Sequence, residues 1–346
     1  MQGQSDSQRT LPGFSELPTD MPPQRPQQAG LLTKAHRTRT AQGGKRMTRR
    51  FSVYGDSIST FEGITPEGWN VFYTGEQLDA TGVKRPEDTW WGQVIDHFGG
   101  QLLGNAAWSG CVVEGTDFPV GASRERIERI APEDAAPDDI LVHIGINDYG
   151  WGSGYAQICA ATPSAPPAAA AACPDHGKVA DMAPEGTVAN FEESYTRMLS
   201  TMHEMWPEAR IWVSTLLPGR VKGSANPTFP RHFRGICVDE YNQAIAKAAA
   251  AVPNCELVDM CAPGFDYEAI DGTHPTDTGM KQMAALFIRG MRAADPSLPD
   301  TPYAGDALLK ENMASSEFCT RPCVGCEHAR GTGSNWWHVC EKQLQK

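Results

Sequence analysis

Apolar residues follow two alternating patterns along the chain. Five short apolar runs predict buried strands over residues 50–54, 101–104, 140–144, 211–215 and 257–259. Between them, apolar residues recur at spacings of three and four, which is typical of helices, over residues 88–98, 124–130, 191–206, 239–251 and 278–292. This alternation predicts a three-layer α/β/α sandwich, in which a five-stranded parallel sheet is covered by helices on both faces.

The helix expected over residues 191–206 has the clearest apolar stripe. Phe191, Tyr195, Met198 and Met202 are spaced by three or four residues, so they fall on one side of the helix. We expect this side to pack on the sheet and not to bind a ligand.

Pro-rich and Gly-rich segments predict the domain organisation. Residues 1–47 contain five prolines and no apolar periodicity, so we expect a disordered leader, and translation starting at Met47 is an alternative. A folded domain is expected over residues 48–296, with insertions at 151–190 and 218–235, followed by a linker and tail over 297–346. Composition leaves open whether the insertion at 151–190 is a lid or has no role.

Charge is distributed unevenly along the chain. Residues 1–50 carry nine Lys or Arg and three Asp or Glu, whereas the remainder carries 21 basic and 39 acidic residues. An acidic domain repels phosphate backbones and anionic lipid, so we expect neither nucleic acid nor a membrane as a partner. Because no export signal accompanies the ten cysteines, a reduced, cytoplasmic protein is expected.

Chemically capable residues follow the predicted strands. Gly55-Asp56-Ser57 follows the first strand, Ser109-Gly110 the second, and Asn147-Asp148 the third, while Asp271-Gly272-Thr273-His274 precedes the last helix. The carboxyl ends of parallel strands meet at one edge of a sheet, so these motifs are expected to converge there. A serine, a histidine and an acid together are what a hydrolase needs to activate a hydroxyl group.

These four motifs occur in the order found in the SGNH (GDSL) hydrolase family, and the chain from about residue 50 to 292 resembles that family. The resemblance implies a flavodoxin-like fold and a serine esterase or acylhydrolase that needs no cofactor for catalysis. His274 would be the general base for the Ser57 nucleophile, and Asp271 would orient the imidazole. The oxyanion hole would consist of the backbone N–H groups of Ser57 and Gly110 and the side chain of Asn147.

A small or carbohydrate-linked acyl ester is the expected substrate, cleaved through an acyl-enzyme on Ser57. Aromatic residues near the motifs, including Trp69, Phe72, Tyr73 and Trp108, could stack on a sugar ring, although most are expected in the core. The alternative is a non-catalytic binding or scaffold protein that uses the cysteine-rich tail for partner contact. The single motifs also have structural interpretations, in which residues 271–274 form a turn, Gly110 allows a positive φ, and Asn147 caps the following turn. Oligomeric state is not predicted.

Four cysteines gather in the tail: Cys319, Cys323, Cys326 and Cys340. Four thiolates at this spacing favour a structural zinc site, which would stabilise a segment too short for its own core. The first three also match the spacing of radical SAM iron–sulfur motifs, and two disulfides are a third alternative. Cys111 is expected to be a buried apolar residue, and we do not expect it to act as a nucleophile.

Overall fold

A computed structural model of the chain describes residues 48–151, 187–217, 219–223, 232–233, 236–261, 264–309, 329–331 and 338–340. The described residues all belong to the unit Met47–Lys346. The predicted leader and most of the 151–190 insertion therefore lie outside the described residues. In the tail, β10 (Ala329–Gly331) pairs with β11 (His338–Cys340) in an antiparallel ribbon.

Five parallel strands form the central sheet, in the order β2-β1-β3-β4-β8. Their bounds are Arg50–Gly55 for β1, Gln101–Asn105 for β2, Asp139–His143 for β3, Arg210–Ser214 for β4 and Cys255–Val258 for β8. All five lie within two residues of the predicted strands. The five-stranded parallel sheet predicted from the sequence is confirmed, with the flavodoxin-like strand order.

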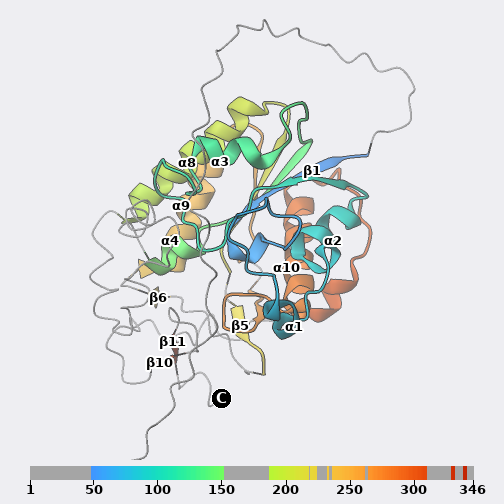
Figure 1. Ribbon diagram of the computed structural model, residues 1–346, viewed down its shortest axis with the longest axis vertical. Coiled ribbons are helices and arrows are strands. Elements are labelled where there is room, and N and C mark those ends of the chain that lie inside the picture. The colour runs from blue at the N-terminus through green and yellow to red at the C-terminus, as the bar shows by residue number, and fades with distance from the viewer. Residues whose placement is uncertain are drawn as a thin grey trace, which may run out of the picture. The chain divides into compact units, whose positions relative to one another are not determined.

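Helices cover both faces of this sheet (Figure 1). On one face, α2 (Trp90–His97) packs against α10 (Asp277–Ala294), and α10 also contacts β8. On the other lie α3 (Arg124–Ile127), α8 (Thr187–Met205) and α9 (Val238–Ala251). The apolar stripe predicted for α8 is confirmed, since Phe191, Tyr195, Met198 and Met202 are all fully buried.

Shorter elements connect these layers. The additional helices are η1 (Ser57–Ser59), α1 (Glu76–Thr81), η2 (Pro86–Asp88), η3 (Glu128–Ile130), α4 (Ile146–Trp151) and η4 (Ala304–Leu308). The additional strands are β5 (Gly219–Val221), which pairs with β9 (Tyr267–Ala269), and β6 (His232–Phe233), which pairs with β7 (Ile236–Cys237).

Strand order determines which loops become neighbours. β1 lies between β2 and β3, so the turn that carries Ser57 is flanked by the loop containing Gly110 and by α4, which contains Asn147. Parallel strands place all three segments at the same edge of the sheet. The fold thus brings together the motifs that were separated in the sequence.

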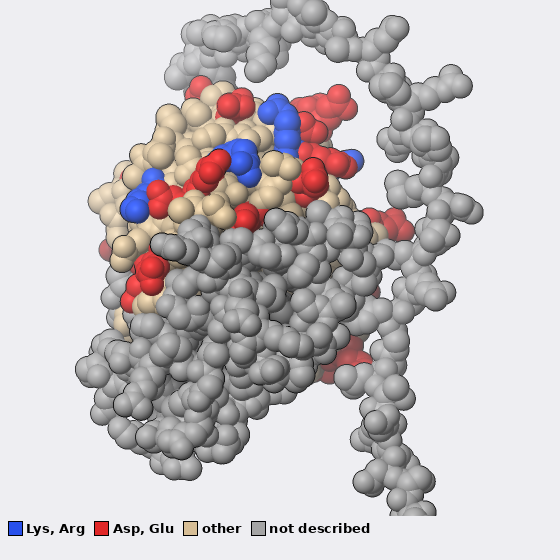
Figure 2. Space-filling view, turned by 90° about the vertical axis from the view of Figure 1, so that its left-hand side faces the viewer, with Lys and Arg blue, Asp and Glu red and all other residues tan. Residues whose placement is uncertain are grey.

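Figure 2 shows acidic side chains at several places on the described part of one face, interspersed with basic ones. No helix within the described ranges is both long and apolar enough to span a bilayer.

Candidate active site

Ser57 lies in a tight turn directly after β1. The Asp56 carboxylate caps this turn, because its Oδ1 accepts a hydrogen bond of 3.1 Å from the backbone N–H of Ile58. A Cβ atom on Gly55 would lie 2.3 Å from Ser59 Oγ and 2.8 Å from the His143 carbonyl oxygen, so only glycine fits before the turn. The tight turn keeps the Ser57 side chain close to the sheet, and Ser57 is 4% exposed.

The His274 imidazole is hydrogen-bonded to Ser57 on one side and to Asp271 on the other. Nε2 lies 2.9 Å from Ser57 Oγ, and Nδ1 lies 2.7 Å from Asp271 Oδ2. The other carboxylate oxygen of Asp271 accepts the backbone N–H groups of Thr273 and His274, at 2.9 and 2.8 Å. The structure therefore brings the three residues together in the order hydroxyl, imidazole, carboxylate.

The environment of Asp271 favours its ionised form. Burial acts to raise the pKa of this carboxyl group, but the His274 charge and three hydrogen bonds from residues 273 and 274 outweigh it. The net pKa of Asp271 lies below its ordinary value. At neutral pH it is a carboxylate, which accepts a hydrogen bond from Nδ1–H and leaves Nε2 facing the serine.

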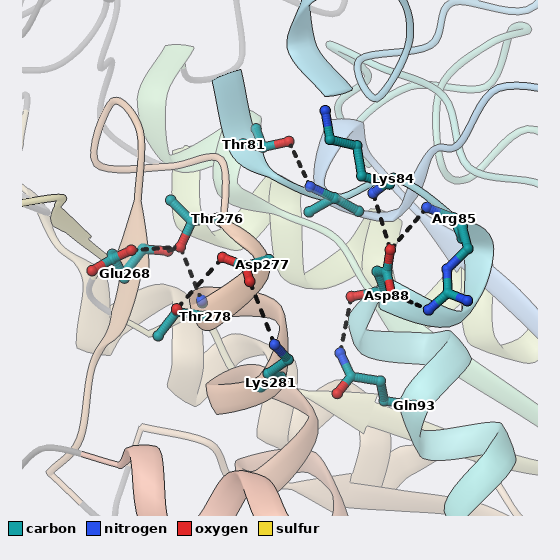
Figure 3. A network of polar contacts seen from close by, with 12 residues as sticks. Thr81, Lys84, Arg85, Asp88, Gln93, Glu268, Thr276, Asp277, Thr278 and Lys281 are labelled. Carbon is teal, nitrogen blue, oxygen red and sulfur yellow. Dashed lines mark hydrogen bonds and ion pairs between the residues drawn. The ribbon is translucent and has the colours of Figure 1, made fainter. Parts of the chain in front are cut away.

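Several contacts anchor the loop that carries Asp271 and His274. Thr276 caps α10, since its Oγ1 accepts the N–H of Gly279 and donates to Glu268 Oε1 at 2.8 Å (Figure 3). Two buried tyrosines bind the same loop, as Tyr267 donates to the Thr273 carbonyl at 2.8 Å and Tyr73 to the Pro275 carbonyl at 3.0 Å. The residues on both sides of His274 are therefore held by hydrogen bonds from the core.

A hydrogen bond also joins Asn147 to the segment that contains Gly110. Gly110 has a φ of 81°, a left-handed conformation that favours glycine. The Asn147 side chain is 1% exposed, and its Nδ2 donates to the Cys111 carbonyl at 2.7 Å. An amide NH₂ group carries two N–H donors, so this hydrogen bond uses one and orients the other.

Asp148 strengthens the same junction. Its carboxylate accepts the backbone N–H groups of Val113 at 2.9 Å and Glu114 at 3.0 Å. These bonds tie α4 to the loop that follows β2. Asp148 therefore has a local structural role.

Comparison with known proteins places this architecture in a family. The sequence model of the GDSL-like Lipase/Acylhydrolase family matches residues 53–282, which is more than half of the chain. The chain belongs to this family. Its membership supports ester hydrolysis as the class of activity.

Several solved structures resemble this GDSL-like protein. A protein described as a GDSL-like lipase from Bacteroides uniformis is 20% identical, with 72% of this chain and 97% of that chain covered and a TM-score of 0.44. A family two carbohydrate esterase from Clostridium thermocellum, in complex with cellohexaose, is 13% identical, with 73% and 66% covered and a TM-score of 0.43. No curated protein gives a significant sequence match.

Two other carboxylates of this GDSL-like domain differ from Asp271. Burial raises the pKa of Asp56 to about 6 and that of Asp148 to about 7, although hydrogen bonds from backbone N–H groups oppose the effect in both cases. Asp56 accepts the backbone N–H of Ile58, and Asp148 accepts those of Val113 and Glu114. Asp271 is thus the acid that the geometry places against the base.

Cys111 lies beside Gly110 but is poorly suited to nucleophilic chemistry. It is 3% exposed, and burial raises the pKa of its thiol to about 12, despite the nearby Arg126 guanidinium. The thiolate is the reactive form of cysteine, so this thiol is inert at neutral pH.

Sequence reasoning missed two residues that contact the site. Arg126 was not singled out, yet it is fully buried and donates to the carbonyl of Gly55, beside the serine turn. Phe72 was noted as one of several aromatic residues, but its ring stacks on His274 with centroids 3.6 Å apart. Neither Arg126 nor Phe72 belongs to a motif, so no sequence pattern distinguishes them from neighbouring residues.

The predicted zinc ligands Cys319, Cys323 and Cys326 lie outside the described residues, as does the side chain of Cys340 at the end of β11. Within the part of the chain that is described, no cluster of three or more His, Cys, Asp or Glu side chains is arranged to hold a metal ion.

Proposed function

We propose that the protein is a serine esterase or acylhydrolase that forms an acyl-enzyme on Ser57. The observation that carries this proposal is the continuous hydrogen-bonded chain from Ser57 Oγ through His274 to Asp271. In this arrangement the imidazole removes the hydroxyl proton as the oxygen attacks the ester carbonyl. The protonated imidazole then donates that proton to the departing alcohol.

Hydrolysis of the acyl-enzyme repeats the same steps with water. His274 accepts a proton from water as it attacks the acyl carbonyl, and returns it to Ser57 Oγ when the carboxylic acid leaves. In both steps the carbonyl oxygen becomes negatively charged. We propose that the N–H groups of Ser57 and Gly110 and the Asn147 side chain stabilise this charge.

The substrate proposal is a small or carbohydrate-linked acyl ester. Three aromatic side chains cluster beside the Gly110 loop, with Trp69, Trp108 and Phe118 centroids 5.1 to 5.5 Å apart. Each is partly exposed. Aromatic faces of this kind pack against the apolar faces of sugar rings or short acyl chains.

Turnover of p-nitrophenyl acetate by purified protein tests the proposal, with Ser57→Ala and His274→Ala measured beside the wild type. We expect both variants to lose at least about 10³-fold in kcat/KM. A fluorophosphonate probe should label the wild type on Ser57 and leave Ser57→Ala unlabelled. Equal turnover by all three proteins would instead favour a non-catalytic binding or scaffold protein.

Acyl-chain length is tested separately. A series of p-nitrophenyl esters from acetate to long-chain acyl groups, together with acetylated sugars, should show highest kcat/KM for short chains or for the sugar esters. A preference for long acyl chains would reject the substrate proposal and leave the Ser57 mechanism intact.

A further inference from the structure

Phe72 contacts the face of the His274 imidazole, whereas the two hydrogen bonds of that ring are made at its nitrogen atoms. The phenyl and imidazole planes are nearly parallel, at 7°, and their centroids are 3.6 Å apart. Hydrogen bonds at Nδ1 and Nε2 lie in the plane of the imidazole and fix its direction. A ring stacked on the face opposes tilting out of that plane.

The same residue is coupled to the nucleophile through its backbone. Thr60 Oγ1 donates to the Ser57 carbonyl at 2.9 Å and accepts the N–H of Phe72, also at 2.9 Å. Thr60 is fully buried, so this link is shielded from water. One hydroxyl therefore connects the turn that carries the nucleophile to the residue that covers the base.

Tyr73 holds the Phe72 ring in place. Its ring meets Phe72 edge-on, with centroids 5.1 Å apart and planes at 78°, and its hydroxyl donates to the Pro275 carbonyl beside His274. Tyr73 is fully buried, and Phe72 is partly buried. The stack is thus supported by the core and does not depend on a mobile surface side chain.

The charge of the imidazole changes during the reaction, and the strength of its contact with Phe72 changes with it. When His274 takes the Ser57 proton it becomes an imidazolium. The face of a phenyl ring is electron-rich and attracts a cation more strongly than a neutral ring. A contact within the enzyme that strengthens as charge develops raises kcat, whereas one that is equally strong in both states changes neither kcat nor KM.

We propose that Phe72 is a positioning residue that holds the His274 ring and stabilises its protonated form during acylation and deacylation. This inference rests on the proposed function, because it requires His274 to act as the base for Ser57. Phe72 itself donates no proton and forms no bond to the substrate.

Kinetics of Phe72→Leu and Phe72→Tyr with p-nitrophenyl acetate give the first test. Leucine retains apolar bulk but has no π face, so we expect kcat to fall about 5- to 30-fold with KM within about twofold of the wild type. Tyrosine keeps the ring and should remain within about twofold. Unchanged kcat in Phe72→Leu would overturn the proposal.

Fluorinated phenylalanines at position 72 separate the electronic effect from packing. Each added fluorine withdraws electron density from the ring face with little change in size, so kcat should fall progressively with the number of fluorines. This series also keeps the proposal testable if Phe72→Leu fails to fold. If fluorination leaves kcat unchanged, the electrostatic role is rejected.

Phe98 supplies a matched control. It is also partly buried and contacts a histidine, since its ring lies edge-on to His97 at 4.9 Å, but this pair lies at the carboxyl end of α2. Phe98→Leu and fluorinated rings at position 98 should leave kcat unchanged. Failure of the proposed function would look different, because the wild type itself would then show no turnover dependent on Ser57.

Discussion

The guanidinium of Arg126 donates a hydrogen bond to the carbonyl oxygen of Gly55, two residues before Ser57. The same side chain donates to the Ala106 carbonyl at 2.9 and 3.0 Å, to the Pro119 carbonyl at 3.2 Å and to Cys111 Sγ at 2.9 Å. It also lies over the Tyr54 ring, 4.4 Å from the centroid. One buried cation therefore joins the carboxyl end of β1 to the loop that follows β2.

Replacing Arg126 with methionine should destabilise the protein strongly. Three buried carbonyl oxygens would lose a donor. The Gly55 carbonyl would keep the N–H of Trp108, whereas those of Ala106 and Pro119 would lose their guanidinium donors, and each unsatisfied group costs about 1–3 kcal/mol, so the free energy of unfolding should fall by about 2 kcal/mol or more. Urea denaturation measures the change. Arg129→Met is the control, because Arg129 is exposed and should shift stability by less than about 0.5 kcal/mol. Similar stability of the two variants would contradict the buried role of Arg126.

Asp271→Asn should reduce kcat/KM by about 10²- to 10⁴-fold while leaving the fold intact. The asparagine Oδ1 can still accept the backbone N–H groups of residues 273 and 274, but its amide is a poor partner for Nδ1–H of His274. The wrong tautomer then faces Ser57. Ester hydrolysis and a thermal melt on the same sample check both halves of this expectation. Asp56→Asn is the informative comparison, since Asp56 caps the turn and we do not expect it to set the tautomer.

Asn147 is expected to donate to the oxyanion beside its hydrogen bond to the Cys111 carbonyl. Asn147→Ala and Asn147→Asp should both lower kcat by about 10²- to 10³-fold with little change in KM, because the carboxylate, like the methyl group, has no N–H to donate. Steady-state kinetics measure the effect. A loss confined to KM would assign Asn147 to substrate binding instead.

His143 should make stability depend on pH. It is buried at the carboxyl end of β3 and hydrogen-bonded to Ser214 Oγ at 2.7 Å, and burial lowers the pKa of His143 from 6.5 to about 4. In the unfolded chain the imidazole binds a proton as pH falls below about 6.5, but in the folded protein it does so only near 4. Its contribution to stability is therefore complete above about pH 6.5 and is lost as pH falls from there towards 4.

His143→Gln cannot titrate, so its free energy of unfolding should decrease less over this window, by up to about 3 kcal/mol relative to the wild type. The raised pKa values of Asp56 and Asp148 act in the opposite direction, but they occur in both proteins and cancel in the difference. Urea titrations at several pH values measure it. Between pH 7.5 and 8.5 the difference should be constant, and parallel curves at every pH would refute the assignment.

The four cysteines of the tail predict about one zinc ion per chain in protein purified under reducing conditions without chelators. Cys323→Ser or Cys326→Ser should lower this content sharply. Because the proposed ester hydrolysis uses no metal, chelation should leave turnover of p-nitrophenyl acetate unchanged. Metal analysis that finds iron would favour the iron–sulfur alternative, and the absence of any metal would reject the site.

The central sheet could be predicted from the sequence because its strands are short apolar runs with few competing interpretations. The helix α4 could not, since Asn147, Asp148 and Gly150 are typical turn residues, and a six-residue helix has no apolar stripe to detect. Its formation depends on contacts such as the Asp148 bonds to residues 113 and 114. These contacts join residues 34 and 35 positions apart, so no local pattern reveals them.

The site was predictable to the extent that its residues follow strands. Ser57, Gly110 and Asn147 each come after an apolar run, so the geometry of parallel sheets places them at one edge. Arg126 carries no such signal, because nothing in the pattern separates it from the exposed Arg124 and Arg129 nearby. The contact between Phe72 and His274 joins segments 202 residues apart. Only the folded chain reveals it.

Asp271 and His274 belong to one short loop, whereas Ser57 belongs to the opposite end of the domain's sequence. A rigid displacement of this loop would separate the imidazole from the hydroxyl while preserving its bond to the carboxylate. The contact between acid and base is therefore local in the sequence, whereas the contact between base and nucleophile depends on the tertiary fold. Such a displacement would break the contacts of the loop with Ser57, Phe72 and Tyr73, while the pair of acid and base stays intact.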